Sequence, residues 1–382
     1  MSLRARAFVR ALLVCSLAAS SVACGAAKGK VQNAQVAGEL PPANPLAVAK
    51  MAQGVAAAKE VNGHARGIAL LREAVTIDPK LWEAHYDLGV VSASAGELKE
   101  AEAALAIAAK LAPSQEDVAI ALAEVRRRRG SYKDAADALA DFVKQNPEAL
   151  AARTLYVTAL RDSGQMDRAV SEGREVLSRR PGNAAALSEL ALCHLAKGER
   201  DVAELLVKQA IDTDAKSAVA HRTMGLVQLA RGDDATAFQS FQKAAQLDPL
   251  DTTARANMGS VLLKAGVYGK AEEQFRAILA VTKDDAAAEV GLAAAIRGGS
   301  DGKPGPKLEE ARAILDHVLA RDPHNTAALF NLGVLVTDFF KKPQDAMKYF
   351  EQFLADAADK DPARPEAQKY VAMIAAGKGA PK

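Results

Sequence analysis

The side chains best suited to metal or nucleophilic chemistry in this chain are six histidines and three cysteines. No two histidines stand four residues apart, so the HExxH arrangement that binds zinc on one helix face is absent. Cys193 and His194 are neighbours. Adjacent residues on a helix point about 100° apart, however, and make a poor chelate. The spacing of these residues therefore predicts no metal site.

A short glycine-rich segment raises the question of nucleotide binding. Gly302 and Lys303 resemble the end of a phosphate-binding P-loop, but Arg297 stands where such a loop needs its first glycine. Pro304 follows where the loop needs Ser or Thr. With no catalytic constellation elsewhere, we expect a protein that is not an enzyme and that uses no cofactor and no small-molecule substrate.

The composition indicates the kind of elements that carry these residues. The 382 residues are 49% hydrophobic and only 4% aromatic, and alanine is abundant. This balance favours closely packed helices over a β-rich fold. The formal net charge of +2 gives no electrostatic footprint for nucleic acid. Outside the N-terminus no run of about 18 apolar residues occurs, so the body of the chain is not expected to cross a membrane.

Three residue types recur with a spacing of 34 residues. A glycine, which can end a helix in the left-handed conformation, recurs at Gly96, Gly130, Gly164, Gly198, Gly232 and Gly266. An alanine, small enough to let two helices approach, recurs at Ala101, Ala135, Ala169, Ala203, Ala237 and Ala271. A proline that stops the second helix occurs at Pro79, Pro113, Pro147 and Pro181. Ala215 interrupts the proline series and Pro249 resumes it.

This period and these residues strongly resemble the tetratricopeptide repeat (TPR) family. The resemblance implies an all-α fold, a right-handed superhelical solenoid of about nine helix-turn-helix repeats with a C-terminal capping helix. We expect the array over residues 48–362, and the capping helix and tail over 363–382. Residues 298–307 are expected to form a protruding loop, and repeat nine to hold one extra residue in its turn. The repeats are expected to begin near residues 48, 82, 116, 150, 184, 218, 252, 286 and 326.

In TPR proteins the first helix of each repeat, called helix A below, builds the concave face that binds partners. Carried over position by position, the resemblance assigns partner binding to Tyr86, Val90, Ile120, Glu124, Arg127, Thr154, Thr158, Arg161, Ser188, Leu192, Arg222, Leu226, Ser260, Phe330 and Val334. The Lys/Asn/Arg clamp of chaperone-binding TPR proteins is missing, so a peptide with a C-terminal carboxylate is not the expected ligand. The face suits an extended peptide, a helix or a loop of a protein partner.

Four consecutive arginines, Arg126 to Arg129, end helix A of the third repeat. Cations stabilise the C-terminal end of a helix, which is one interpretation of the run. Contact with an acidic partner or an anionic lipid headgroup is the other.

The N-terminus has the pattern of a secretory signal over residues 1–23, with Arg4, Arg6 and Arg10 before a short apolar stretch. Ala23 and Cys24 resemble the lipobox of bacterial lipoproteins, in which the cysteine is diacylated. Residues 24–46 would then be the lipidated cysteine and a flexible tether. An ordinary signal cleaved near Ala23 is the alternative. Cleavage after residue 23 leaves 46 basic and 47 acidic residues, because the signal holds three arginines and no acid.

The residue after the lipidated cysteine is Gly25, where an Asp usually retains Gram-negative lipoproteins in the inner membrane. The resemblance therefore implies a lipid anchor in the outer membrane, facing the periplasm, as the one membrane contact. The layout is similar to TPR lipoproteins of gliding-motility machinery, which implies a scaffold that assembles a multiprotein envelope complex. Pilotin-like factors of type IV pilus secretins, or a peptidoglycan-binding tether for cell-wall enzymes, are the alternatives.

Overall fold

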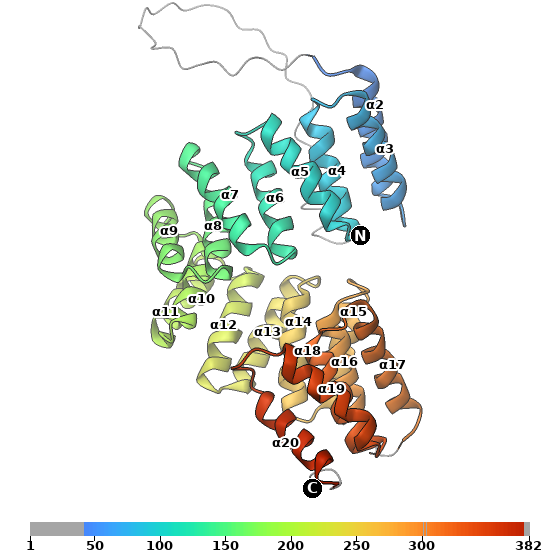
Figure 1. Cartoon of the computed structure of the whole chain (residues 1–382). Helices are drawn as coiled ribbons and strands as arrows, with labels where there is room; N and C mark the ends of the chain where they lie inside the picture. The colour runs from blue at the N-terminus through green and yellow to red at the C-terminus, as the bar shows by residue number, and fades with distance from the viewer. Residues whose placement is uncertain (1–41, 301, 303, 378–382) are drawn as a thin grey trace, which may run out of the picture. The chain divides into compact units, whose positions relative to one another are not determined.

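The computed structural model describes residues 42–300, 302 and 304–377. Within these ranges every regular element is helical, and α2 to α20 are joined by a single π-helix, η1 (Figure 1). The all-α prediction is confirmed. The expected signal peptide, Cys24 and the tether up to residue 41 lie outside the described residues. Two compact units divide the helices, one within residues 42–215 and the other within 216–377.

The first unit contains five helix pairs, each a helix A followed by a helix B. Their bounds are α2 Pro45–Ala58 and α3 His64–Ile77, α4 Trp82–Ala95 and α5 Leu98–Leu111, α6 Glu116–Arg128 and α7 Tyr132–Gln145, α8 Leu150–Asp162 and α9 Met166–Arg179, and α10 Ala184–Ala196 and α11 Arg200–Thr213.

The second unit contains four further pairs and a last single helix. Their bounds are α12 Ala218–Arg231 and α13 Asp234–Leu247, α14 Thr252–Lys264 and α15 Tyr268–Leu279, α16 Ala286–Gly298 and α17 Pro306–Arg321, α18 Thr326–Val334 continued by η1 Leu335–Phe339 and paired with α19 Pro343–Asp356, and α20 Arg364–Ala375.

The chain begins its first helix earlier than the repeat register suggests. Helix α2 starts at Pro45 rather than near residue 48. The Asn44 side chain accepts a hydrogen bond from the Leu46 amide, and Pro45 occupies the first helical position, where its missing N–H costs nothing.

The ends and interfaces of the helices follow from the three ladders. Gly96 caps α4 with φ 86°, and the amide of Glu97 bonds back to the carbonyl of Ser92 at 2.9 Å. All six ladder alanines have no exposed surface. Gly89 brings the two helices of its repeat together, since a Cβ there would lie 2.4 Å from the Leu105 side chain. Each repeat therefore buries its core only by packing helix A against helix B and the next repeat.

The C-terminal repeats depart from the regular pattern in two places. The extra residue of repeat nine does not lengthen the turn as expected, because the helix absorbs it as the π-turn Leu335–Phe339. Lys341, with φ 57°, then takes the left-handed conformation that glycine supplies in most other repeats. In repeat eight, α16 ends at Gly298 and α17 begins at Pro306.

The last helix, α20, covers the apolar face of the final pair. Tyr370 is 4% exposed and Ile374 is 2% exposed. The Tyr370 ring stacks on Phe350 of α19 with centroids 4.7 Å apart. Its hydroxyl donates to Asp338 at 2.6 Å. Helix α20 therefore closes the array in the way that the sequence predicts for a capping helix.

Candidate binding surface

The charged residues assigned to partner binding in the first unit are joined by a ladder of ion pairs along three helices A. Arg127 of α6 pairs with Glu124 at 2.7 Å and with Asp162 of α8 at 2.6 Å. Arg161 pairs with the same Asp162 at 3.1 Å and with Glu189 of α10 at 3.0 Å. The ladder therefore links α6, α8 and α10 and fixes the spacing of neighbouring repeats.

Two members of this ladder were missed by the sequence reasoning. Asp162 stands at repeat position thirteen, which belongs to the concave face by the resemblance, so its position was a usable signal. Glu189 stands at position six and follows directly after Ser188, so no positional rule includes it. Both carboxylates are mostly covered, with 14% and 13% of their side chains exposed.

The accessible end of the ladder opens into a surface hollow of about 330 Å³. The hollow is lined by Glu124, Arg127, Arg128, Tyr132 and Asp162. Both ladder arginines are already bonded to carboxylates. The hollow therefore presents a hydrogen-bonding surface of mixed charge rather than a free cationic site for an anion.

Three other assigned residues are not available on the surface, which corrects the sequence prediction. Ser188 is fully buried, and its hydroxyl donates to the carbonyl of Ala184 at 2.8 Å. Thr158 is 9% exposed and bonds back to the Thr154 carbonyl at 3.3 Å. Val90 is 6% exposed and packs into the core. Small hydroxyl residues on a helix satisfy themselves by bonding one turn back, which lets them be buried.

The remaining assigned residues of this unit are partly accessible. These are Tyr86, Ile120, Thr154 and Leu192. Burial, with the nearby carboxylates of Asp117 and Asp87, raises the pKa of Tyr86 to about 12. Tyr86 therefore stays a neutral phenol, with an apolar ring and a hydrogen-bonding tip of the kind enriched in protein interfaces.

In the second unit the assigned residues have different roles. Arg222 pairs with Asp251, which is 1% exposed and caps α14 by accepting from the Ala254 amide. The Phe330 ring lies against Phe350 and Phe353, with centroids 6.1 and 5.4 Å away, so it contributes to packing. Leu226 and Val334 are partly exposed, and Ser260 is exposed.

The four-arginine run is used mainly inside the first unit. Arg126 and Arg129 both pair with Glu102 of α5, the first at 3.0 Å. Arg128 donates to the carbonyl of Ala93 at 2.9 Å, and Arg127 belongs to the ladder. The run therefore ties α4, α5, α6 and α8 together in addition to stabilising a helix end.

The residues considered for chemistry have ordinary structural surroundings. Cys193 has no exposed surface, and burial raises the pKa of its thiol to about 11, so it is a poor nucleophile. His194 bonds to Glu199, and His85 contacts the Pro79 carbonyl at 3.1 Å. Among the described residues no group of three or more His, Cys, Asp or Glu side chains could hold a metal.

Residues 298–302 have the spacing of a nucleophile elbow, with Ser300 at its centre. An elbow needs a strand before the serine, and Ser300 instead follows helix α16 and donates to the Arg297 carbonyl at 2.7 Å. This spacing therefore has no catalytic setting. Within the described ranges, no helix is long and apolar enough to cross a membrane.

Comparisons with known proteins agree with this geometry. Tetratricopeptide repeat profiles match residues 51–116 and 120–184, and a second such profile matches 160–225. The structure of the APC/C hetero-tetramer Cut9–Hcn1 is 15% identical, with a TM-score of 0.57, and the match covers 85% of this chain and 63% of that one. This chain thus spans less than two thirds of that neighbour's length. No curated protein matches.

Two bacterial structures are similar at lower scores. The structure reported for Pseudomonas aeruginosa pilF is 20% identical, with a TM-score of 0.49 and coverage of 61% of this chain and 99% of that one. A tetratricopeptide repeat protein from Parabacteroides merdae is 16% identical, with a TM-score of 0.44 and coverage of 77% and 98%. The chain is therefore a solenoid protein built from tetratricopeptide repeats, a fold that generally serves as a protein-protein interaction scaffold.

Proposed function

We propose that this chain is a non-enzymatic scaffold of a Gram-negative cell envelope, anchored in the outer membrane by a diacylated Cys24 and facing the periplasm. The repeat array is the observation that carries the proposal, because helix pairs stacked at a fixed period present long surfaces for protein partners. The anchor rests on the signal-like pattern before Ala23 and Cys24. The best-matching machine is the gliding-motility apparatus, from the resemblance in layout.

The surface of the first unit supports this proposal. Its ion-pair ladder fixes the relative positions of α6, α8 and α10, so little ordering is needed when a partner binds. Tyr86 and Ile120 supply a ring and an aliphatic side chain beside the mixed charges. Because both ladder arginines are paired, the expected ligand is a polar segment of a protein with no free terminal carboxylate.

Lipidation is tested by labelling with a radioactive fatty acid in cells that express the tagged chain. We expect Cys24→Ala to abolish the label and release the protein from the membrane fraction. Cys193→Ala is the matched control, because Cys193 is buried and should leave labelling unchanged. A labelled Cys24→Ala protein would contradict the anchor.

The scaffold role is tested by purifying the tagged full-length chain from native membranes in mild detergent and identifying stoichiometric partners. We expect Tyr86→Ala on helix A of repeat two to reduce recovery of these partners. Ile107→Ala is the control, since Ile107 is 41% exposed on helix B of the same repeat. Loss with the control and not with Tyr86→Ala would place binding elsewhere.

The identity of the partners separates the machines. Motility proteins would support the first proposal, and secretin or pilus subunits would replace it with a pilotin-like role. Recovery of the chain alone, together with salt-resistant binding to purified sacculi, would favour a cell-wall tether instead.

A further inference from the structure

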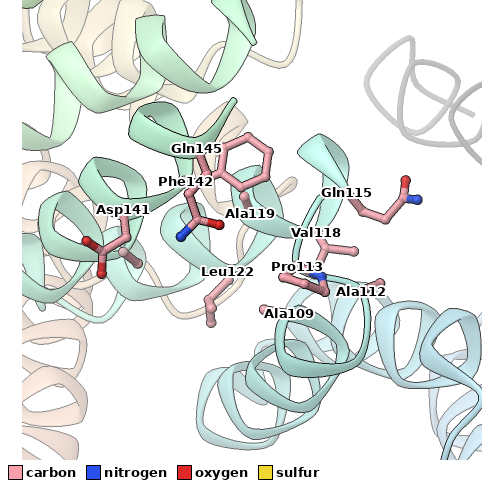
Figure 2. A pocket seen from close by; sticks show the side chains of 11 residues that line it. Ala109, Ala112, Pro113, Gln115, Val118, Ala119, Leu122, Asp141, Phe142 and Gln145 are labelled. Carbon is pink, nitrogen blue, oxygen red and sulfur yellow. The ribbon is translucent and has the colours of Figure 1, made fainter. Parts of the chain in front are cut away.

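An apolar socket of about 180 Å³ opens between two helices B, α5 and α7, with helix α6 between them (Figure 2). Its wall is formed by Ala109 of α5, by Val118, Ala119 and Leu122 of α6, and by Phe142 of α7. None of these residues belongs to the ion-pair ladder or to the predicted partner-binding set. The socket is therefore a surface feature separate from the one proposed above.

The socket exists because one repeat breaks a pattern that the others keep. The fourth residue of helix A fills the groove between the preceding helix B and the helix B of its own repeat. From α4 to α18 the residues at this position are His85, Ala119, Arg153, Leu187, His221, Arg255, Glu289 and Leu329. Only Ala119 is small.

The neighbouring repeats show how the groove is normally filled. Arg153 reaches from the Val143 carbonyl of α7 to Glu172 of α9, at 3.3 and 2.5 Å. Leu187 fills the equivalent groove with 1% of its surface exposed. Ala119 has no side chain beyond Cβ to do the same. Repeat three therefore leaves the space that the other repeats close from within.

The rim of the socket carries a single charge. Gln115 and Gln145 contribute amide groups, and Asp141 contributes an exposed carboxylate. Within the part of the chain that the structure describes, no cation lies within ion-pair distance of Asp141. An apolar pit beside an unpaired carboxylate is complementary to an apolar side chain with a cation close to it.

We propose that this socket docks a helix of a protein partner, which inserts one leucine-sized or phenyl side chain over Ala119 and places a Lys or Arg against Asp141. The size fits, because an apolar cavity of about 150 Å³ takes up a benzene molecule. The shape also fits, because the trough between α5 and α7 can receive a helix lengthwise. A partner side chain supplies here what residue four supplies in the other repeats.

The experiment uses the purified full-length chain and a displayed library of short amphipathic helices, each with one apolar residue and one residue one turn away left variable. Selection on the natural chain, with counter-selection on Ala119→Leu, isolates helices that need the open socket. The variant should fold, because Leu187 and Leu329 occupy the same position in other repeats. Circular dichroism should show a melting temperature raised by a few degrees.

We expect the selected helices to carry Leu, Ile, Met or Phe with Lys or Arg one turn away. In fluorescence anisotropy they should bind Ala119→Leu at least about tenfold more weakly, since burying one such side chain contributes roughly that factor. Asp141→Asn should weaken them by a few-fold. Ala103→Leu is the control, because Ala103 is exposed on α5 and does not line the socket.

Two results would overturn the proposal. One is a selection in which no helix distinguishes the natural chain from Ala119→Leu. The other is a set of helices whose affinity is unchanged when their apolar residue is replaced by alanine. Neither result bears on the lipid anchor or on Tyr86, so the proposal of an envelope scaffold would stand.

Discussion

Asp87 of α4 should make the stability of the first unit depend on pH. The residue is 6% exposed, and no described residue donates a hydrogen bond to its carboxylate. Burial and the nearby charge of Glu83 raise the pKa of Asp87 to about 7, and Lys59 opposes them. An ionised carboxylate in this position is therefore destabilising.

The sign and size follow from linkage. The pKa of Asp87 rises from an ordinary value of 3.8 to about 7 in the folded chain, so the folded chain holds the proton more tightly. The resulting stability is complete below about pH 4 and is lost as the pH rises through about 7. A shift of about three units corresponds to about 4 kcal/mol. Relaxation around the charge makes this an upper value.

Replacing the carboxyl by an amide removes the titration. We expect Asp87→Asn to stabilise the chain by about 2–4 kcal/mol at pH 8 and to have little effect near pH 4. Urea unfolding followed by circular dichroism at both pH values measures the difference. Asp359→Asn is the control, because Asp359 is exposed. An equal effect at both pH values, or none at pH 8, would refute the reasoning.

Three further substitutions test the packing of the repeats. Ala203→Asp buries an unpaired charge at a fully covered ladder position and should cost about 3 kcal/mol or more, lowering the thermal melt of the repeats around it. Gly259→Ala places a Cβ 2.7 Å from a phenyl ring and should destabilise by about 1–3 kcal/mol in urea, whereas Gly269→Ala, with open space around it, should stabilise by up to about 1 kcal/mol. Tyr370→Phe leaves the buried carboxylate of Asp338 without its hydrogen bond and should cost about 1–3 kcal/mol, and an unchanged urea midpoint would contradict that role.

The fold could be predicted from the sequence because its determinants are local and repeated. A glycine, an alanine and a proline at a constant spacing each fix one event in a helix pair, as Gly96, Ala101 and Pro113 do in repeat two. The π-turn at Leu335–Phe339 could not be predicted in this way, because an extra residue can enter either the helix or the turn. Tertiary packing of the helix decides between them.

The binding surface was predictable only in outline. Repeat position identified Arg127 and Arg161, but the pairing of both with Asp162 depends on how neighbouring repeats are rotated. The same limit explains the error at Ser188. Position five is exposed in Tyr86 because a large ring extends past the backbone, whereas a serine hydroxyl bonds back to its own helix and stays buried.

The fourth position of helix A offers a reciprocal test of how the grooves between helices B are filled. Leu187→Ala should open a second socket and cost about 2–5 kcal/mol, because a fully buried leucine is lost and its cavity can close only in part. Ala119→Leu should stabilise by at most about 2 kcal/mol, from roughly three added carbon groups. The two variants change the same position by the same side chain in opposite directions, so urea unfolding should move in opposite directions. If both variants were destabilised, Ala119 would be a position where the helices have closed together, and the space above it would not accept a partner's side chain.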